Sequence, residues 1–241
     1  MRYLVPVAGA LSVGLALLSG CSAPQDAEPE ERKPRASKAA ERVPEPLTSA
    51  ELKALTFKDG EVPQASEGGM EVTEFAAEEG ESEFPPVSDP YCQFVNEIRS
   101  GESASAGVSQ LFNWKDDIFA GDSVIAAYPA GRAESEFDRL REALDRCESY
   151  EGESYGGDYR ARIEEKSTAG FGDEAVTFLE MIPMDHPKDP RERVSQFTVV
   201  RVGDVIATFL RYDLGHTTPF PADLIKKQVE RLAEAQEQRV R

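Results

Sequence analysis

The sequence predicts an α+β domain over residues 47–241, with helices packed against an antiparallel sheet of about six strands. The first observation is the stretch from Arg193 to Leu214, where two runs rich in Val, Ile, Phe and Thr flank the pair Gly203-Asp204. A Gly-first pair of this kind is typical of a two-residue hairpin turn. The second observation is a pair of amphipathic helical patterns, at residues 134–147 and after Pro221, each with an apolar side that needs a sheet to cover it.

The hairpin pattern determines which side chains share a face. Counting outward from Gly203-Asp204 places Val199 opposite Thr208 and Phe197 opposite Leu210. Both faces are then apolar, so the hairpin is expected in the middle of the sheet, with cover on each side or with one side open as a groove. One face carries Phe197, Val199, Ile206, Leu210 and Tyr212, and the other carries Val200, Val202, Val205, Ala207 and Phe209.

The shorter elements follow in chain order. Thr48 to Glu51 match a capping box that begins a short helix, and Asp89-Pro90 match the N-cap and first position of a second helix. Glycine-rich stretches at 101–107 and 152–157 are expected to be loops. Residues 58–90 are acidic and broken by Gly and Pro, with one strand candidate at Met70–Phe75. Further strands are expected at Val108–Trp114, Ser123–Tyr128, Tyr159–Ser167 and Glu174–Ile182.

The two longer helices are identified by their apolar stripes. In the helix expected over Glu134–Cys147, the residues Phe137, Leu140, Leu144 and Cys147 fall on one side and charged residues fill the other. The last helix begins near Pro221, with Asp223 at its positive end and Ile225, Val229 and Leu232 on its buried side.

Residues 1–20 match a secretory signal, with one positive charge, an apolar run too short for a membrane span, and Leu18-Ser19-Gly20 before Cys21. The four residues that end at Cys21 resemble the lipobox of bacterial lipoproteins. That resemblance implies cleavage before Cys21 and acylation of its thiol, and it places the protein on the extracytoplasmic face of the cell membrane. The alternative is an uncleaved anchor helix that ends by chance in a free cysteine.

Residues 22–46 are rich in Pro, Glu, Arg and Ala and hold one large apolar residue, Val43. Such a segment cannot bury enough surface to offset its ordering entropy, so residues 21–46 are expected to be a disordered tether. The whole chain carries a net charge of −18, which argues against nucleic acid and against electrostatic adhesion to anionic lipid. The acidity is interpreted as solubility in an exposed domain, and the alternative is a cationic partner.

Lipidation of Cys21 leaves Cys92 and Cys147, and an exported chain with two remaining cysteines most simply joins them in one disulfide. The alternative is two separate buried thiols. No metal site and no cofactor are expected, because there is no second pair of closely spaced cysteines and only two histidines.

One motif raises the possibility of catalysis. Residues 152–156 match GxSxG around Ser154, but the serine-hydrolase elbow needs a strand before the serine and a helix after it, and the expected order is reversed. A connecting loop is therefore the favoured interpretation, with a hydrolase as a minor alternative. For a ligand groove beside the sheet, the candidate lining residues are Trp114, Phe209 and Tyr212, for which core packing is the alternative.

Residues 47–235 resemble the extracellular sensor domains of PknH-type receptor Ser/Thr kinases and the lipoproteins that carry such a domain. The matching features are Pro90-Tyr91-Cys92, Phe137 to Cys147, Gly172-Asp173-Glu174 at the start of a strand, Val199 to Gly203 at the hairpin turn, and the closing helix. The resemblance implies a twisted antiparallel sheet flanked by helices, with a cleft for a ligand. The sequence departs from the family in offering one cysteine pair instead of two, and in lacking a kinase domain and a transmembrane helix.

The expected function is therefore a non-enzymatic binding or sensor module for a small molecule or a cell-envelope component, tethered to the membrane through Cys21. The alternative is a structural lipoprotein that contacts another envelope protein and has no ligand groove. A cavity beside Phe209 or Tyr212 would favour the first, and a filled core on both faces of the sheet would favour the second.

Overall fold

The computed structural model describes residues 45–76, 85–154, 156–184 and 190–240. The predicted signal peptide, Cys21 and the tether as far as residue 44 lie outside these described residues, as does His186. In the described part no helix is both long and apolar enough to cross a membrane.

The fold is α+β, as predicted, but the antiparallel sheet has eight strands where about six were expected. The strand order is β1-β2-β3-β8-β7-β6-β5-β4. The strands are β1 (Ala65–Ala76), β2 (Ala106–Trp114), β3 (Gly121–Ala127), β4 (Ser149–Ser154), β5 (Gly157–Lys166), β6 (Glu174–Pro183), β7 (Glu192–Val202) and β8 (Val205–Leu214).

The strand that the sequence pattern misses is β4, which pairs with β5 in a tight hairpin where a loop was expected. Its sequence, SYEGES, has one buried side chain, Tyr150, so there is no apolar alternation to reveal a strand. At the opposite edge of the sheet, the candidate run Met70–Phe75 is the final part of the longer strand β1.

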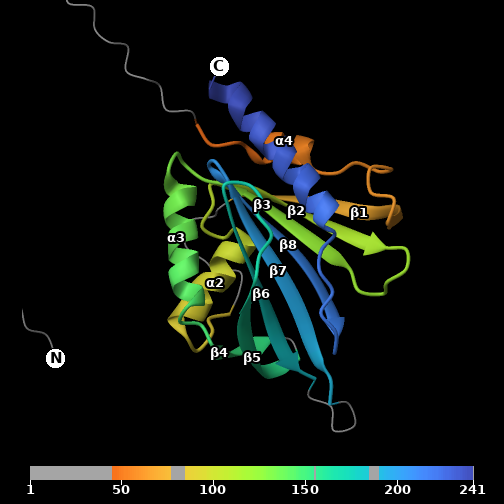
Figure 1. Cartoon of the computed structure of the whole chain (residues 1–241), viewed down its shortest axis with the longest axis vertical. Helices are drawn as coiled ribbons and strands as arrows, with labels where there is room; N and C mark the ends of the chain where they lie inside the picture. The colour runs from red at the N-terminus through yellow and green to blue at the C-terminus, as the bar shows by residue number, and fades with distance from the viewer. Residues whose placement is uncertain (1–44, 77–84, 155, 185–189, 241) are drawn as a thin grey trace, which may run out of the picture. The chain divides into compact units, whose positions relative to one another are not determined.

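Helices cover both faces of the sheet (Figure 1). α1 (Ser49–Leu55) and α4 (Ala222–Val240) lie on one face, and α2 (Pro90–Ser100) and α3 (Arg132–Leu144) lie on the other. The predicted capping box of α1 is present, and the Asp89 side chain accepts hydrogen bonds from the backbone N–H groups of Tyr91 and Cys92 at the start of α2. The predicted helix 134–147 begins two residues earlier and ends three residues earlier than expected.

The β7–β8 hairpin has the predicted register, with Val199 opposite Thr208 and Phe197 opposite Leu210. Gly203 adopts a φ of +54°, in the left-handed region where a side chain is strained, and its turn partner Asp204 does not have a positive φ. A Cβ at Gly203 would also meet the Gln236 side chain of α4 at 2.6 Å. This glycine therefore serves both the turn and the packing of α4 over it.

The two apolar faces of the hairpin belong to two separate cores. Val200, Val202 and Phe209 pack with residues of α1 and α4, including Leu52 and Leu232. Phe197, Val199 and Ile206 pack with residues of α2 and α3, including Val95, Phe137 and Leu140. The central position of the hairpin, with cover on each side, is thus confirmed over this part of its length.

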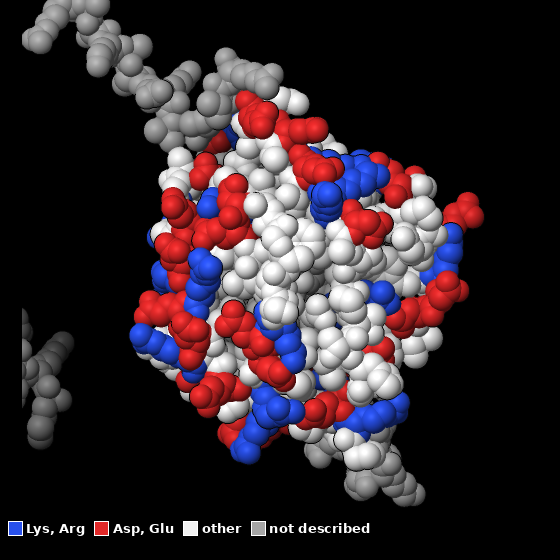
Figure 2. All heavy atoms as spheres, in the orientation of Figure 1, with Lys and Arg blue, Asp and Glu red and all other residues white. Residues whose placement is uncertain are grey.

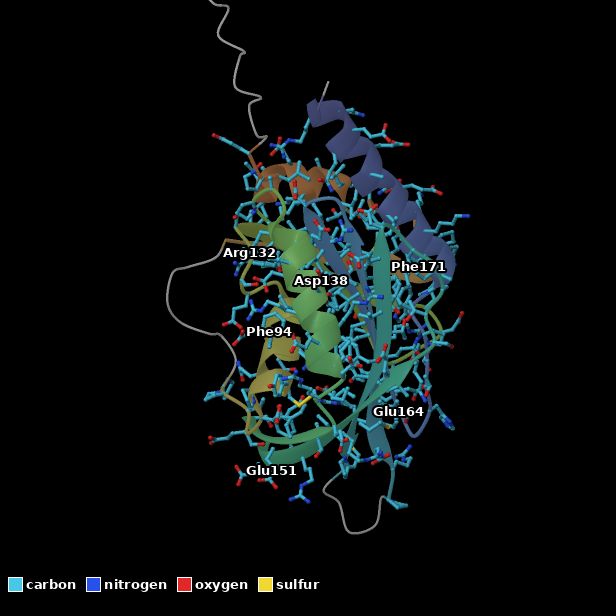
Figure 3. All side chains as sticks on the ribbon, turned by 60° about the vertical axis from the view of Figure 1, so that its left-hand side comes forward. Phe94, Arg132, Asp138, Glu151, Glu164 and Phe171 are labelled. Atoms are coloured by element: carbon cyan, nitrogen blue, oxygen red, sulfur yellow. A yellow bond between two sulfur atoms is a disulfide. The ribbon has the colours of Figure 1, made fainter. Side chains whose placement is uncertain are left out.

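The predicted disulfide joins Cys92 in α2 to Cys147 just after α3, with Cα atoms 5.0 Å apart. Figure 3 shows it as the yellow bond between α2 and the end of α3. Both cysteines are buried within the core on this side of the sheet, so the bond ties the two helices of that face together.

Candidate functional site

A buried ionic cluster lies on the α2/α3 side of the sheet, centred on Glu180 of β6. The Glu180 side chain is 4% exposed, and one of its carboxylate oxygens accepts from Arg99 Nη1 at 2.8 Å. The same oxygen accepts from the Tyr150 hydroxyl of β4, while Arg193 Nη2 of β7 lies 3.8 Å from the other oxygen. The Arg99 guanidinium also stacks over the Phe197 ring, 4.4 Å from its centroid.

The contacts of this cluster favour the charged form of Glu180 and the neutral form of Tyr150. Burial alone raises the pKa of the Glu180 carboxyl, but Arg99 and the Tyr150 hydrogen bond outweigh burial, so the pKa lies below its ordinary range. Burial and the Glu180 carboxylate raise the pKa of Tyr150, which keeps its hydroxyl as the donor. Because Arg99 and Tyr150 both donate hydrogen bonds to Glu180, the cluster connects α2 and β4 to strand β6.

On the α2/α3 face of the sheet, the part that extends beyond α2 is less covered by helices. Six residues there are half-buried: Ser109 and Leu111 of β2, Asp122 of β3, Leu210 and Tyr212 of β8, and Phe119 of the β2–β3 loop. We call these six residues the Asp122 surface. Asp122 lies directly opposite Leu111 on one neighbouring strand and Leu210 on the other, so its carboxylate is flanked by apolar side chains.

Asp122 is the unusual residue of this surface. Its Oδ2 accepts a hydrogen bond of 3.0 Å from the Ser109 hydroxyl. No Lys or Arg within the part of the chain that the structure describes forms an ion pair with it. Burial raises the pKa of the Asp122 carboxyl to about 6, and the Ser109 hydrogen bond offsets only part of that effect. A carboxylate held in this way at neutral pH is an uncompensated negative charge on a partly apolar surface.

Two aromatic rings of this surface pack together. Phe119 and Tyr212 have ring centroids 5.3 Å apart, inclined at 53°. Tyr212 is two positions along β8 from Leu210, so it is the diagonal neighbour of Asp122 on the same face, at a typical spacing of about 7–8 Å. Ile118, beside Phe119 in the loop, is 91% exposed. The surface therefore combines one anion, an aromatic wall and a fully exposed apolar side chain.

The structure separates the three residues predicted to line a groove. Trp114 and Phe209 lie on the α1/α4 face, where both rings pack against Phe220. Phe209 is fully buried and Trp114 is 6% exposed, so both belong to the core there. Tyr212 lies on the opposite face, because three positions along a strand reverse the direction of a side chain. Asp122 was not among the predicted residues, because between Gly121 and Ser123 at the start of a strand it has no distinguishing pattern in the sequence.

Ser154 lies at the end of β4, in a turn that leads from strand to strand. Its hydroxyl donates to the Gly157 carbonyl and accepts from the Gly156 N–H, each at 3.3 Å. A nucleophile elbow places the serine between a strand and a helix, so the local geometry is that of a hairpin turn. Among the described residues, no three or more His, Cys, Asp or Glu side chains gather in a way that could hold a metal ion.

A large open hollow of about 840 Å³ lies beside the β4–β5 hairpin, away from the Asp122 surface. Val87, Gly152 and Tyr159 form part of its wall. Its cation, Arg160, already pairs with Glu151, and both side chains are more than half exposed. The charged side chains Arg160 and Glu151 in the hollow are thus exposed to water, whereas the carboxylate of Asp122 is half-buried.

Figure 2 shows an area without charged residues between α3 and α4, over β6 and the segment that leads into it. The apolar side chains of this part of the sheet, Leu179, Met181 and Val194, are all less than 9% exposed. Phe171, labelled in Figure 3, is half-buried against the α1/α4 core. These four side chains therefore add little exposed apolar surface to the uncharged area.

One comparison with solved structures relates this arrangement to a known protein. The crystal structure of the extracellular domain of PknH from Mycobacterium tuberculosis superposes with a TM-score of 0.54, covering 80% of this chain and 98% of that chain at 13% identity. The chain has the fold of the PknH extracellular domain. No protein-family model matches the sequence, and no curated protein sequence is significantly similar to it. At 13% identity the similarity to PknH establishes the fold and leaves residue roles to be argued from this chain.

Proposed function

We propose that this protein is a lipid-anchored lipoprotein whose PknH-like domain works as a binding or sensor module outside the cytoplasm. The observation that supports it most directly is the sensor-type fold, which spans nearly the whole PknH extracellular domain. The Cys92–Cys147 disulfide agrees with an oxidising, extracytoplasmic setting, where such bonds persist.

The proposed anchor is Cys21, at the end of the Leu18-Ser19-Gly20-Cys21 pattern. Each buried CH₂ group contributes about 0.8 kcal/mol to membrane binding, and one acyl chain alone is marginal, so two or more chains on Cys21 would hold the protein stably. A tether over residues 21–46 would then set the distance between the domain and the membrane.

The proposed binding site is the Asp122 surface. No cation among the residues that the structure describes pairs with the half-buried Asp122 carboxylate, and groups with perturbed pKa values gather at functional sites. On the α1/α4 face, Phe209 and its neighbours fill the core. The ligand would be a small molecule or a component of the cell envelope.

Two measurements test this function. In a Triton X-114 extraction the wild type should enter the detergent phase. The mass of its N-terminal peptide should show that the chain begins at an acylated Cys21. The variant Cys21→Ser should keep its leader and lack the mass of the acyl chains. Wild-type protein that partitions into water with residues 1–20 still present would refute the anchor. Native mass spectrometry of protein purified from membranes should show a retained ligand, and Asp122→Asn should lose it.

A second function, contact with another envelope protein without a ligand, is favoured by one observation. Ile118 is 91% exposed at the edge of the Asp122 surface, where an isolated apolar side chain could enter a partner's pocket. Crosslinking in intact cells distinguishes the two functions. A crosslinked partner that is lost with Ile118→Ser but kept with Asp122→Asn supports the interaction role. A retained ligand that is lost with Asp122→Asn but kept with Ile118→Ser supports ligand binding.

A further inference from the structure

We propose that the Asp122 surface binds a small molecule through an alkylammonium group, with Asp122 as counter-ion and the rings of Tyr212 and Phe119 as its wall. This inference rests on the proposed binding function and adds the chemical class of the ligand.

The first step of the argument is charge complementarity. The Asp122 carboxylate faces Leu111 from β2 and Leu210 from β8, and the Ser109 hydroxyl supplies one hydrogen bond. The next acidic residue on this face is Glu71 of β1, opposite Leu111, and Glu71 is exposed so that water screens its charge. No cation among the described residues pairs with Asp122, so a cationic ligand would supply the missing partner.

The second step concerns the arginines of the nearby ionic cluster. Phe197 lies opposite Leu210, which in turn lies opposite Asp122, so the guanidinium of Arg99 above Phe197 is about two strand spacings away, roughly 10 Å. Arg99 is bound to Glu180 at 2.8 Å and is held there by its stacking on Phe197. It therefore cannot reach Asp122 to neutralise it without breaking the buried cluster.

The third step separates an alkylammonium group from other cations. A metal ion needs several oxygen or nitrogen ligands, and the described residues show no group of three or more His, Cys, Asp or Glu that could hold one. An alkylammonium group needs one counter-ion and apolar or aromatic contacts for its carbon atoms. The faces of aromatic rings also attract the cation. Asp122 with the Tyr212–Phe119 pair and the flanking leucines provides that combination.

The probe that tests the inference is choline chloride, titrated by calorimetry at low salt into the full chain purified in detergent. The matched neutral probe is 3,3-dimethylbutan-1-ol, which has the same shape with carbon in place of the charged nitrogen. Choline should bind at least about tenfold more tightly than the neutral alcohol, because only its quaternary ammonium forms an ion pair with Asp122 and a cation–π contact with the two rings.

Variants locate the site. Asp122→Asn should weaken choline binding at least about tenfold, while the matched control Glu71→Gln, exposed on the same face, should change it by less than about twofold. Tyr212→Leu should weaken binding several-fold while Tyr212→Phe, which keeps the ring, should retain it. Circular dichroism of each variant shows whether it is folded.

Several outcomes would overturn the inference. Equal affinity for choline and the neutral alcohol, unchanged binding in Asp122→Asn, or no binding of choline at millimolar concentration would each do so. Tighter binding of N-acetyl-lysine methylamide than of choline would assign the surface to a protein side chain instead. A retained ligand that is neutral or anionic would overturn the ammonium assignment while supporting the proposed function. Choline binding by a protein that stays in the aqueous phase would refute the anchor and leave this inference standing.

Discussion

Replacing Asp122 with Asn should stabilise the folded protein at neutral pH. Its carboxyl has a pKa of about 6 in the folded state against an ordinary value of 3.8, so the folded state takes up a proton first as the pH falls. The carboxylate therefore costs stability above pH 6, and this cost disappears as the pH falls from about 6 to about 4. A difference of about two pKa units corresponds to at most about 3 kcal/mol at pH 7.5. Partial exposure of Asp122 reduces this, so we expect about 1–2 kcal/mol.

The assay is urea unfolding of the Cys21→Ser protein, followed by circular dichroism at several pH values between 4 and 7.5, with and without Asp122→Asn. Asn keeps an oxygen that can accept from the Ser109 hydroxyl, so the hydrogen bond at 3.0 Å survives while the charge is removed. The free energy of unfolding of Asp122→Asn should exceed that of the parent at pH 7.5 and match it near pH 4. The exposed control Glu71→Gln should stay within about 0.5 kcal/mol of the parent throughout.

Two results would refute this reasoning. If Asp122→Asn is less stable than the parent at pH 7.5, the carboxylate makes a favourable interaction that the structure does not show. If the difference between the two proteins does not change with pH, the carboxyl of Asp122 has an ordinary pKa in the folded state. Either result would remove the physical reason for regarding Asp122 as a residue retained for binding at the expense of stability.

Three further predictions concern the scaffold. Replacing both Cys92 and Cys147 by Ser opens a loop with a sequence separation of 55 and should lower the free energy of unfolding by about 4 kcal/mol in the chain-entropy model, measured by urea unfolding against the oxidised wild type, with the reduced wild type expected to match the variant. Arg99→Met should cost about 3–5 kcal/mol by leaving Glu180 buried without its main partner, and the double variant with Glu180→Leu should recover much of that loss. Ser154→Ala should leave both stability and any esterase activity of the purified protein unchanged, and loss of such activity in the variant would revive the hydrolase alternative.

The central hairpin could be predicted residue by residue because its information is local. The turn Gly203-Asp204 determines the register, and the alternation of Val, Ile and Phe follows from it, so the pairs Val199–Thr208 and Phe197–Leu210 needed no knowledge of the rest of the chain. The same holds for the capping box of α1 and the N-cap Asp89 of α2. The strand β4 could not be found in this way, because it is an edge strand whose single buried residue is Tyr150.

The candidate site depended on contacts between distant parts of the sequence. Asp122 becomes unusual only when β2 and β8 place Leu111 and Leu210 on either side of it, and these two residues are separated by almost a hundred positions. The pattern alone presents Asp122 as one polar residue at the start of a strand.

The alternation of side chains along β8 explains why two of the predicted groove residues, Phe209 and Tyr212, do not lie together. Phe209 and Tyr212 are three positions apart, so they must point to opposite faces of the sheet. α4 and Phe220 cover the face of Phe209, whereas α2 and α3 cover the opposite face only as far as Leu210. Tyr212 therefore lies just past the edge of the helical cover, near the Asp122 carboxylate, for which the described residues supply no cation. A ligand could contact this face of the sheet without unfolding any helix.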